Sequence, residues 1–231
     1  MKGLLHLDNI TKRYKSRLAL RGVSAEIPQG ARVGLVGPNG AGKTTLMSII
    51  AGLVPTYEGA LQWTEETSFR YAPQDPVFPR RINVMGLMMY YARLEGLSGH
   101  VMSQEVQRVL RAVALWEARD LNSNTLSHGM RKRLCIAQAL LCSHPFVMLD
   151  EPTAGLDPVA STRIEDLMVT TTRLSRGTSV VVSHVLSTIE RSAEQVVLLY
   201  DGKLRWQGSV EAFRCSDNPY VVQFRTASLT G

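Results

Sequence analysis

"GPNGAGKTT" occupies Gly37 to Thr45 and follows the β-rich run RVGLVG at Arg32–Gly37. It matches G-x-x-x-x-G-K-[ST], the pattern of a loop that binds nucleotide phosphates between a strand and a helix. Glycines let the backbone wrap closely around a phosphate chain, and the N–H groups of the loop and the following helix then face the anion. Lys43 can reach the β- and γ-phosphates, and the Thr44 hydroxyl can ligate Mg²⁺. The stretch predicts a P-loop NTPase core without deciding among kinases, GTPases, helicases and transport ATPases.

A second stretch, FVMLDE at Phe146 to Glu151, narrows that choice. Its four apolar residues predict a buried strand, and two acids at the end of a buried strand need a cation or a function. We expect alternation along the strand to turn the two acids to opposite sides. Asp150 would then hold the Mg²⁺ of the phosphate loop, and Glu151 would polarise the attacking water, a role worth roughly 10²–10⁴-fold in rate.

The segments around these motifs predict an α/β fold with two additions. Residues 4–27 contain two alternating segments around Lys15-Ser16, as in an antiparallel pair of strands. The middle of the chain has three segments of helical period and no convincing strand, and strands and helices alternate again afterwards. We therefore expect a P-loop NTPase core with an antiparallel β subdomain and an inserted α-helical subdomain. The expected division is a single domain over 1–231, with a catalytic core at 1–75 and 146–231 and the helical subdomain at 76–145.

The composition is that of an ordinary globular protein, with 231 residues, 45% hydrophobic and 20% charged. The 26 Lys and Arg exceed the 20 Asp and Glu, which suits nucleic acid, an anionic lipid surface or a polyphosphate. These basic residues are spread along the chain, so charge alone selects no partner. The three cysteines lack metal-ligand spacing and indicate reduced thiols in a reducing compartment. Because no apolar run approaches the roughly 18–20 residues of a membrane helix, we do not expect the chain to span a bilayer alone.

The two motifs and five further elements in the same order resemble the ATPase subunit of ATP-binding cassette (ABC) transporters over nearly the whole chain. GPNGAGKTT resembles the Walker A loop of that family, and FVMLDE resembles its Walker B strand with the following glutamate. The other five matching elements are Tyr14, Gln74 in YAPQD, LSHGM at 126–130, AGLD at 154–157 and Ser183-His184.

The resemblance implies ATP and Mg²⁺ as ligands and assigns roles to specific side chains. Tyr14 would stack on the adenine, the Gln74 amide would contact a Mg²⁺-bound or attacking water, and His184 would orient the water beside Glu151. The implied nucleotide-binding residues are Tyr14, Gly37, Pro38, Asn39, Gly40, Ala41, Gly42, Lys43, Thr44, Thr45, Ser127 and Gly129. The implied Mg²⁺ ligands are Thr44, Gln74 and Asp150, and the implied catalytic residues are Gln74, Glu151 and His184.

LSHGM admits two interpretations. Ser127 can act as an ordinary N-cap, or Ser127 and Gly129 can present a hydroxyl and N–H groups to an anion at a helix N-terminus. In the family this signature closes over ATP held by a second subunit, head to tail. His128 and Met130 depart from the commoner glycine and glutamine, whereas Gly129, where we expect backbone freedom to be needed, is kept.

Two neighbouring features each admit two interpretations. The basic run Arg131–Arg133 could approach phosphates, but we favour a solvated face. Asp157 would lie at the contact between subunits and could also cap the helix that follows Pro158.

The resemblance implies an ATPase that dimerises around two MgATP and drives translocation through separate integral membrane permeases. We expect a homodimer on the cytoplasmic face of the inner or plasma membrane, and features such as LSHGMRKRLCIAQALL favour the exporter-like branch. One alternative is an ABC-type ATPase acting on ribosomes or nucleic acid. Such relatives usually carry fused cassettes or long coiled coils, so we do not expect nucleic acid as a partner. A GTPase or kinase is the other alternative, but the sequence has no NKxD-like guanine motif.

Overall fold

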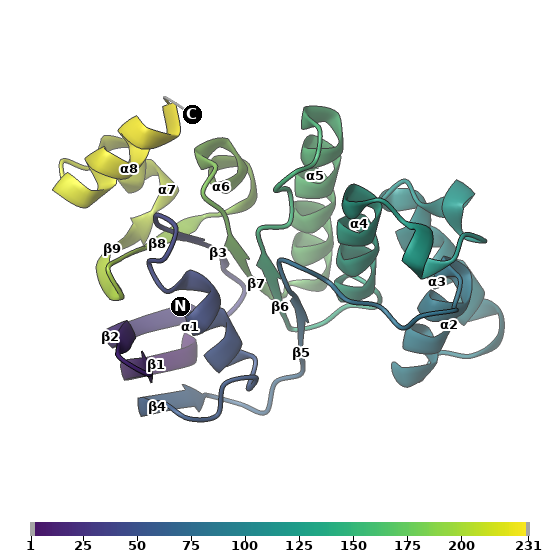
Figure 1. The fold of residues 1–231 in the computed structure, drawn as a ribbon, viewed down its shortest axis with the longest axis horizontal. Coiled ribbons are helices and arrows are strands. Elements are labelled where there is room, and N and C mark those ends of the chain that lie inside the picture. The colour runs from purple at the N-terminus through teal and green to yellow at the C-terminus, as the bar shows by residue number, and fades with distance from the viewer. Residues whose placement is uncertain (1–2, 230–231) are drawn as a thin grey trace.

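A computed structural model of the chain describes residues 3–229 and contains two β-sheets among them (Figure 1). The smaller sheet is antiparallel, with the strand order β2-β1-β4. The larger has the order β5-β6-β7-β3-β8-β9, in which β9 alone runs antiparallel to its neighbour. The strands are β1 (Gly3–Tyr14), β2 (Arg17–Pro28), β3 (Arg32–Val36), β4 (Glu58–Trp63), β5 (Phe69–Ala72), β6 (Phe146–Asp150), β7 (Thr178–Val182), β8 (Gln195–Tyr200) and β9 (Lys203–Ser209).

The central strands of the larger sheet are buried on both faces, which explains why they are continuous apolar runs rather than alternating ones. On β6, Phe146 and Met148 face a core that contains α1 (Lys43–Ile50) and the β1–β2 pair. Val147 and Leu149 face the opposite core, with α4 (His128–Ala139) and α5 (Pro158–Ser175). Helix α1 is therefore held between the two sheets.

The segment between β5 and β6 is helical. It contains α2 (Val84–Leu94), α3 (Gly99–Ala112), two 3-10 turns (Trp116–Ala118 and Ser123–Thr125) and α4. Helices α2 and α3 lie at the end of the molecule opposite the antiparallel sheet (Figure 1). Their buried apolar side chains, such as those of Leu87 and Leu110, belong to the same cluster as Val147 and Leu149. The core therefore continues without a break from the helices onto the sheet.

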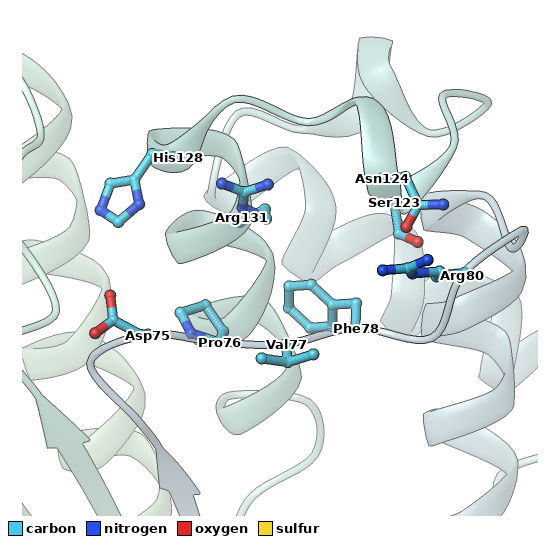
Figure 2. A pocket seen from close by; sticks show the side chains of 9 residues that line it. All are labelled: Asp75, Pro76, Val77, Phe78, Arg80, Ser123, Asn124, His128 and Arg131. Atoms are coloured by element: carbon cyan, nitrogen blue, oxygen red, sulfur yellow. The ribbon is translucent and has the colours of Figure 1, made fainter.

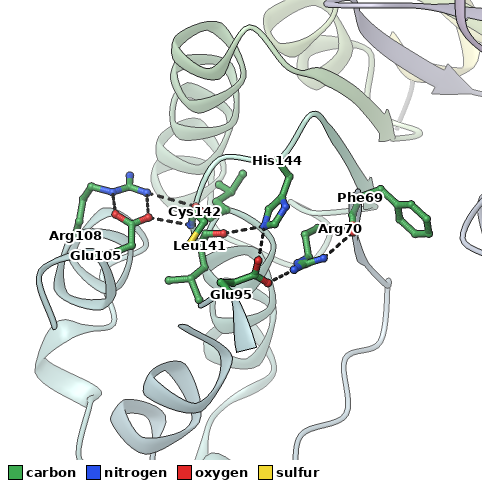
Figure 3. A network of polar contacts seen from close by, with 9 residues as sticks. Phe69, Arg70, Glu95, Glu105, Arg108, Leu141, Cys142 and His144 are labelled. Carbon is green, nitrogen blue, oxygen red and sulfur yellow. Dashed lines mark hydrogen bonds and ion pairs between the residues drawn. The ribbon is translucent and has the colours of Figure 1, made fainter. Parts of the chain in front are cut away.

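A polar network joins α2 to the edge of the larger sheet (Figure 3). The Arg70 guanidinium on β5 pairs with the Glu95 carboxylate at the end of α2. His144, in the segment between α4 and β6, places Nε2 3.2 Å from the Leu141 carbonyl oxygen and 3.5 Å from Glu95 Oε2. Burial and the Arg70 charge lower the pKa of His144. Strand, helix and connecting segment thus share one partly buried polar junction.

The last part of the described chain contains α6 (Leu186–Ser192), α7 (Val210–Cys215) and α8 (Pro219–Leu229). Helix α8 buries Val221 and Phe224 in a third apolar cluster with Phe213 of α7. The sequence predicts no helix at Pro219–Leu229, so α8 adds to the prediction. The predicted fold class, an α/β P-loop core with an antiparallel sheet and inserted helices, is confirmed. Among the helices in the described range, none has the length and apolar content needed to cross a membrane.

Candidate active site

The GPNGAGKTT loop joins β3 to α1 through glycines in backbone conformations that other residues rarely adopt. Gly37, Gly40 and Gly42 have φ angles of 149°, 81° and 104°. A Cβ atom on Gly37 would lie 2.1 Å from the Leu199 carbonyl oxygen, and one on Gly42 would lie 2.7 Å from the Ala19 carbonyl oxygen. Both contacts are too close for a side chain, so the loop requires glycine at these positions.

The turn between β8 and β9 is distant in the sequence but contacts this loop directly, because β8 pairs with β3. The Gly202 N–H donates to the Ala41 carbonyl oxygen at 3.1 Å, and the Gly202 carbonyl oxygen accepts from the Arg21 N–H at 2.8 Å. Together with the close approach of Leu199 to Gly37, this turn fixes the loop between β2 and the β8–β9 hairpin.

Lys43 lies across the inside of the loop and is 7% exposed. Its Nζ donates to the carbonyl oxygens of Gly37 and Pro38, at 2.6 and 3.1 Å. Burial lowers the pKa of Lys43, an effect that the nearby carboxylates of Glu151 and Asp150 oppose. Helix α1 starts after Gly42 with no side-chain cap and no acid in its first turn. An uncapped helix N-terminus beside a buried lysine fits an anionic phosphate chain.

The other predicted core residues gather around the loop in a cleft of about 520 Å³. Tyr14 ends β1, Asp150 ends β6, and Gln74 and His184 lie shortly after β5 and β7. Gln74, Asp150 and His184 meet because the carboxyl ends of the parallel strands β5, β6 and β7 share one edge of the larger sheet, and Tyr14 reaches the cleft from the antiparallel sheet. Predicted site residues that line the cleft are Tyr14, Asn39, Gly40, Gly42, Lys43, Thr44, Thr45, Gln74, Asp150, Glu151 and His184. Gly37, Pro38 and Ala41 belong to the phosphate loop but do not line the cleft.

Asp150 has the properties expected of a Mg²⁺ ligand. The residue is 2% exposed, and the Tyr71 hydroxyl donates to its Oδ2 at 3.3 Å. Its Oδ1 is also buried and has no hydrogen-bond partner among the described residues. Burial raises the pKa of Asp150, and the Thr44 hydroxyl beside it acts in the opposite direction. A buried, unpartnered carboxylate oxygen next to a threonine hydroxyl is a donor set that suits a hard cation.

Glu151 and His184 form a contact pair at the same edge. Glu151 Oε1 lies 2.9 Å from His184 Nδ1, with the Glu151 side chain 8% exposed and that of His184 53% exposed. The alternation argument for the two acids does not apply, because β6 ends at Asp150 and Glu151 has a left-handed φ of 50°. Both acids consequently line the same cleft.

Ser127 and Gly129 do not line this cleft. The Ser127 hydroxyl accepts from the Met130 N–H at 3.2 Å, so Ser127 is the N-cap of α4. Gly129 lies inside α4 and is absent from the residues with positive φ. The expectation that this position needs backbone freedom is therefore wrong. A Cβ there would meet the Leu156 side chain at 3.2 Å.

His128 and Arg131 line a different groove (Figure 2). Its volume is about 550 Å³, and its other wall is the segment after Gln74, including Asp75, Val77 and Phe78. His128 also approaches the AGLD segment, because a Cβ on Gly155 would lie 3.7 Å from the His128 ring. The first turn of α4 thus faces both the segment after β5 and the segment after β6.

Two predictions for the neighbouring charges have different outcomes. The expectation of a solvated basic face is wrong for Lys132, which is 5% exposed because it points from α4 into the interior. Asp157 is the N-cap of α5 and accepts from the Ala160 N–H at 2.9 Å, as its capping interpretation predicts.

Sequence reasoning missed Arg17, Tyr71 and Lys132. Arg17 lines the cleft and donates to the Gly40 carbonyl oxygen at 3.3 Å. The available signal for Arg17 was its position, because it is a cation that directly follows the turn after Tyr14. Tyr71 lies in a strand that pairs with β6, and no local pattern marks a strand tyrosine as the neighbour of Asp150.

Residues 20–154 match the sequence profile of the family described as ABC transporter. The lipopolysaccharide export system ATP-binding protein LptB of Acidithiobacillus ferridurans is 32% identical over 236 residues, covering 96% of each chain. The chloroplastic protein TRIGALACTOSYLDIACYLGLYCEROL 3 of Arabidopsis thaliana is 34% identical over 261 residues, covering 99% of this chain and 75% of that protein.

Solved structures agree on the fold. A structure described as an ATP-binding subunit of an ABC transporter superposes with a TM-score of 0.83 at 24% identity and covers 98% of this chain and 99% of its own. A dimeric bacterial ABC transporter cassette, MJ0796, gives a TM-score of 0.82 at 24% identity, covering 90% and 99%. The alternative of an ATPase acting on ribosomes or nucleic acid gains no support from these relatives.

Proposed function

Because this chain belongs to the ABC transporter family and is an ATPase of that family, we propose that two copies close head to tail around two MgATP and drive transport through separate membrane subunits. The observation that carries the proposal is the incompleteness of the cleft. One chain supplies the phosphate loop, both acids and His184, whereas its own Ser127 and Gly129 lie outside that cleft. A second copy would bring these two residues to the open side of the nucleotide.

Within the cleft, the uncapped N-terminus of α1 and Lys43 would bind the β- and γ-phosphates of ATP. Tyr14, 44% exposed at the end of β1, is available to stack on the adenine. Thr44 and Asp150, with Gln74 at the entrance, would hold Mg²⁺. When bound, Mg²⁺ would neutralise charge on the phosphate oxygens.

Glu151 is the proposed general base for hydrolysis. Its carboxylate lies in the cleft and contacts His184 Nδ1 at 2.9 Å, so the histidine can hold the carboxylate in place while its other nitrogen reaches toward the γ-phosphate. The three residues we propose as catalytic are therefore Glu151, His184 and Gln74.

The proposed partners are a second copy of this chain and integral membrane permeases, with the complex on the cytoplasmic face of the membrane. The relative LptB is named for lipopolysaccharide export, which supports an amphiphilic cargo and export as the direction of transport. We also propose that residues 1–231 act as one ATPase domain in which 76–145 form the helical subdomain that docks the permease. Co-purification from membranes, followed by identification of the bound integral protein, tests this partnership.

The mechanism is tested by Glu151→Gln, which removes the base and keeps the shape of the side chain. We expect hydrolysis to fall roughly 10²–10⁴-fold while MgATP binding is kept. The trapped nucleotide should then hold a dimer that light scattering detects. The matched control adds Ser127→Arg, which should keep the ATP affinity of one chain but block the dimer. A Glu151→Gln protein that stays monomeric at saturating MgATP would contradict the shared site.

A further inference from the structure

Lys132 is a buried cation that the proposed mechanism does not use. It lies in α4, is 5% exposed, and donates from Nζ to the main-chain carbonyl oxygen of Glu151 at 2.9 Å. Lysine is rarely buried to this degree unless it is paired. The charges that stabilise it here are the carboxylates of Glu151, Asp75 and Asp150, and burial still lowers the pKa of Lys132. Packing alone does not explain why a lysine occupies this buried position.

The acceptor of this bond has an unusual backbone. Glu151 has a φ of 50°, a conformation that costs a non-glycine residue free energy and persists only when the surroundings fix it. Its N–H donates to the Val182 carbonyl oxygen at 3.0 Å, and its carbonyl oxygen accepts from the Ala154 N–H at 3.3 Å. His184 contacts its side chain. Of the two bonds that the Glu151 carbonyl oxygen accepts, the bond from Lys132 is the shorter, at 2.9 Å. Lys132 is also the one partner among these four that lies on α4.

The position of Lys132 on α4 connects this contact to the signature segment. Residues four apart lie on the same face of a helix, so Lys132 shares a face with His128, one turn closer to the N-terminus. That face borders the chain after β6 at two places, at Glu151 through Lys132 and at Gly155 through His128. The helix that carries Ser127 and Gly129 is therefore bonded directly to the residue proposed as the base.

We propose that Lys132 is a positioning residue that holds the Glu151 main chain in its left-handed conformation and so aims the carboxylate. The inference rests on the proposed role of Glu151. In this arrangement the orientation of α4 determines where the Glu151 carboxylate points in the same chain, because a shift of α4 moves the Lys132 donor and with it the Glu151 carbonyl. Lys132 does not contact the residues proposed to bind the phosphates or the adenine, so loss of its bond should lower kcat and leave the affinity for ATP unchanged.

The experiment compares three full-length variants in steady-state ATP hydrolysis. Lys132→Met keeps the aliphatic stem and loses the donor, and we expect kcat to fall roughly 10²-fold, the cost of a small misplacement at a reacting group. KM for ATP should stay within about twofold of the wild type. Lys132→Arg keeps a charged donor and should recover most of kcat.

Arg133→Met is the matched control on the same helix. Arg133 donates to the carbonyl oxygens of Val113 and Ala114, at 3.3 and 3.0 Å, so this variant also removes a bond from α4 to the main chain but leaves Glu151 untouched. We expect a similar loss of thermal stability and an unchanged kcat. Equal kcat losses in Lys132→Met and Arg133→Met would overturn the inference.

The Glu151→Gln background separates the two proposals. If Lys132 acts through Glu151, adding Lys132→Met to Glu151→Gln lowers residual turnover by no more than about twofold. A further large loss would identify a general structural role and refute positioning. If Glu151→Gln alone leaves turnover intact, the assigned base is wrong. If Glu151→Gln abolishes turnover and Lys132→Met does not lower kcat, the positioning inference alone fails.

Discussion

Two helices of this chain start at positions where phosphate is expected, and their N-termini differ. Helix α1 starts after Gly42, which has a φ of 104° and no side-chain cap. Helix α4 starts after Ser127, whose hydroxyl accepts from the Met130 N–H at 3.2 Å. The first terminus leaves its N–H groups for a ligand, whereas the second satisfies one of its own.

The two N-termini suit two different roles: α1 binds nucleotide within one chain, and α4 contacts the nucleotide of a partner chain. The N-terminus of α1 lies inside a cleft with a buried lysine and two acids, so a single chain can bind nucleotide there. The N-terminus of α4 is exposed, and Ser127 already caps one of its N–H groups within the chain, so we expect it to keep this conformation whether or not a second chain arrives. Such a terminus is suited to a contact that forms and breaks in each cycle.

Among changes at these two helix termini, the largest expected effect lies at α1. Lys43→Ala should weaken ATP binding roughly 10- to 100-fold, because a charge-assisted hydrogen bond contributes about 1.5–3 kcal/mol. Isothermal titration of MgATP measures the change. Lys203→Ala, on the exposed part of β9, is the control and should leave affinity intact. Unchanged affinity in Lys43→Ala would remove the phosphate-loop assignment.

Glycine-to-alanine changes at the two termini should have opposite signs. Gly42→Ala should destabilise the fold by about 1–3 kcal/mol, because Gly42 has positive φ and a Cβ would lie 2.7 Å from the Ala19 carbonyl oxygen. Gly129→Ala should raise stability by about 0.5 kcal/mol, because alanine favours the helix and the Leu156 side chain can yield. Urea unfolding measures both. A strongly destabilised Gly129→Ala would show that α4 is strained after all.

The serine cap of α4 provides a third comparison, with α7. Ser127→Ala and Ser209→Ala each remove a hydroxyl that accepts from an N–H three residues later, so each should cost about 1 kcal/mol of stability. Only Ser127→Ala should also lower ATP turnover, because only that hydroxyl is proposed to meet a partner's nucleotide. Equal turnover in the two variants would make Ser127 a structural cap alone.

The smallest expected effect concerns the junction between the helices and the sheet. The folded pKa of His144 lies below its unfolded value, so the unfolded chain binds the proton first as pH falls. His144 therefore contributes stability above about pH 6.5 that is lost as pH falls toward the lowered folded pKa. His144→Gln should flatten this dependence, measured as urea midpoints between about pH 5.5 and pH 7.5. An unchanged slope would show that other groups cause it.

Much of the fold follows from the sequence because its signals are local or ordered along the chain. The apolar run that begins at Phe146 is predicted to be a buried strand and is observed as β6, Phe146–Asp150, buried throughout. The cleft residues after β5, β6 and β7 meet because the carboxyl ends of these neighbouring parallel strands lie together. The motif order then limits which side chains can gather there.

What the sequence did not predict depends on contacts between distant segments. Arg131–Arg133 look like a solvated face, and only the docking of α4 against the chain after β6 buries Lys132. The left-handed φ of Glu151 likewise reflects bonds from β7 and α4 that no local pattern encodes. Helix α8 was missed because its cluster partner, Phe213, lies on another helix.

The clamp formed by Leu199 and Gly202 has a consequence for dissecting this protein. An N-terminal fragment that stops before residue 195 would contain the complete GPNGAGKTT motif yet lack the hairpin that bonds to Ala41 and closes over Gly37. Such a truncation should not retain nucleotide, whereas two separately expressed pieces that reassemble the hairpin should regain it. Affinity for ATP in this sense depends on two segments, around residues 37–45 and 199–202, that lie far apart in the sequence.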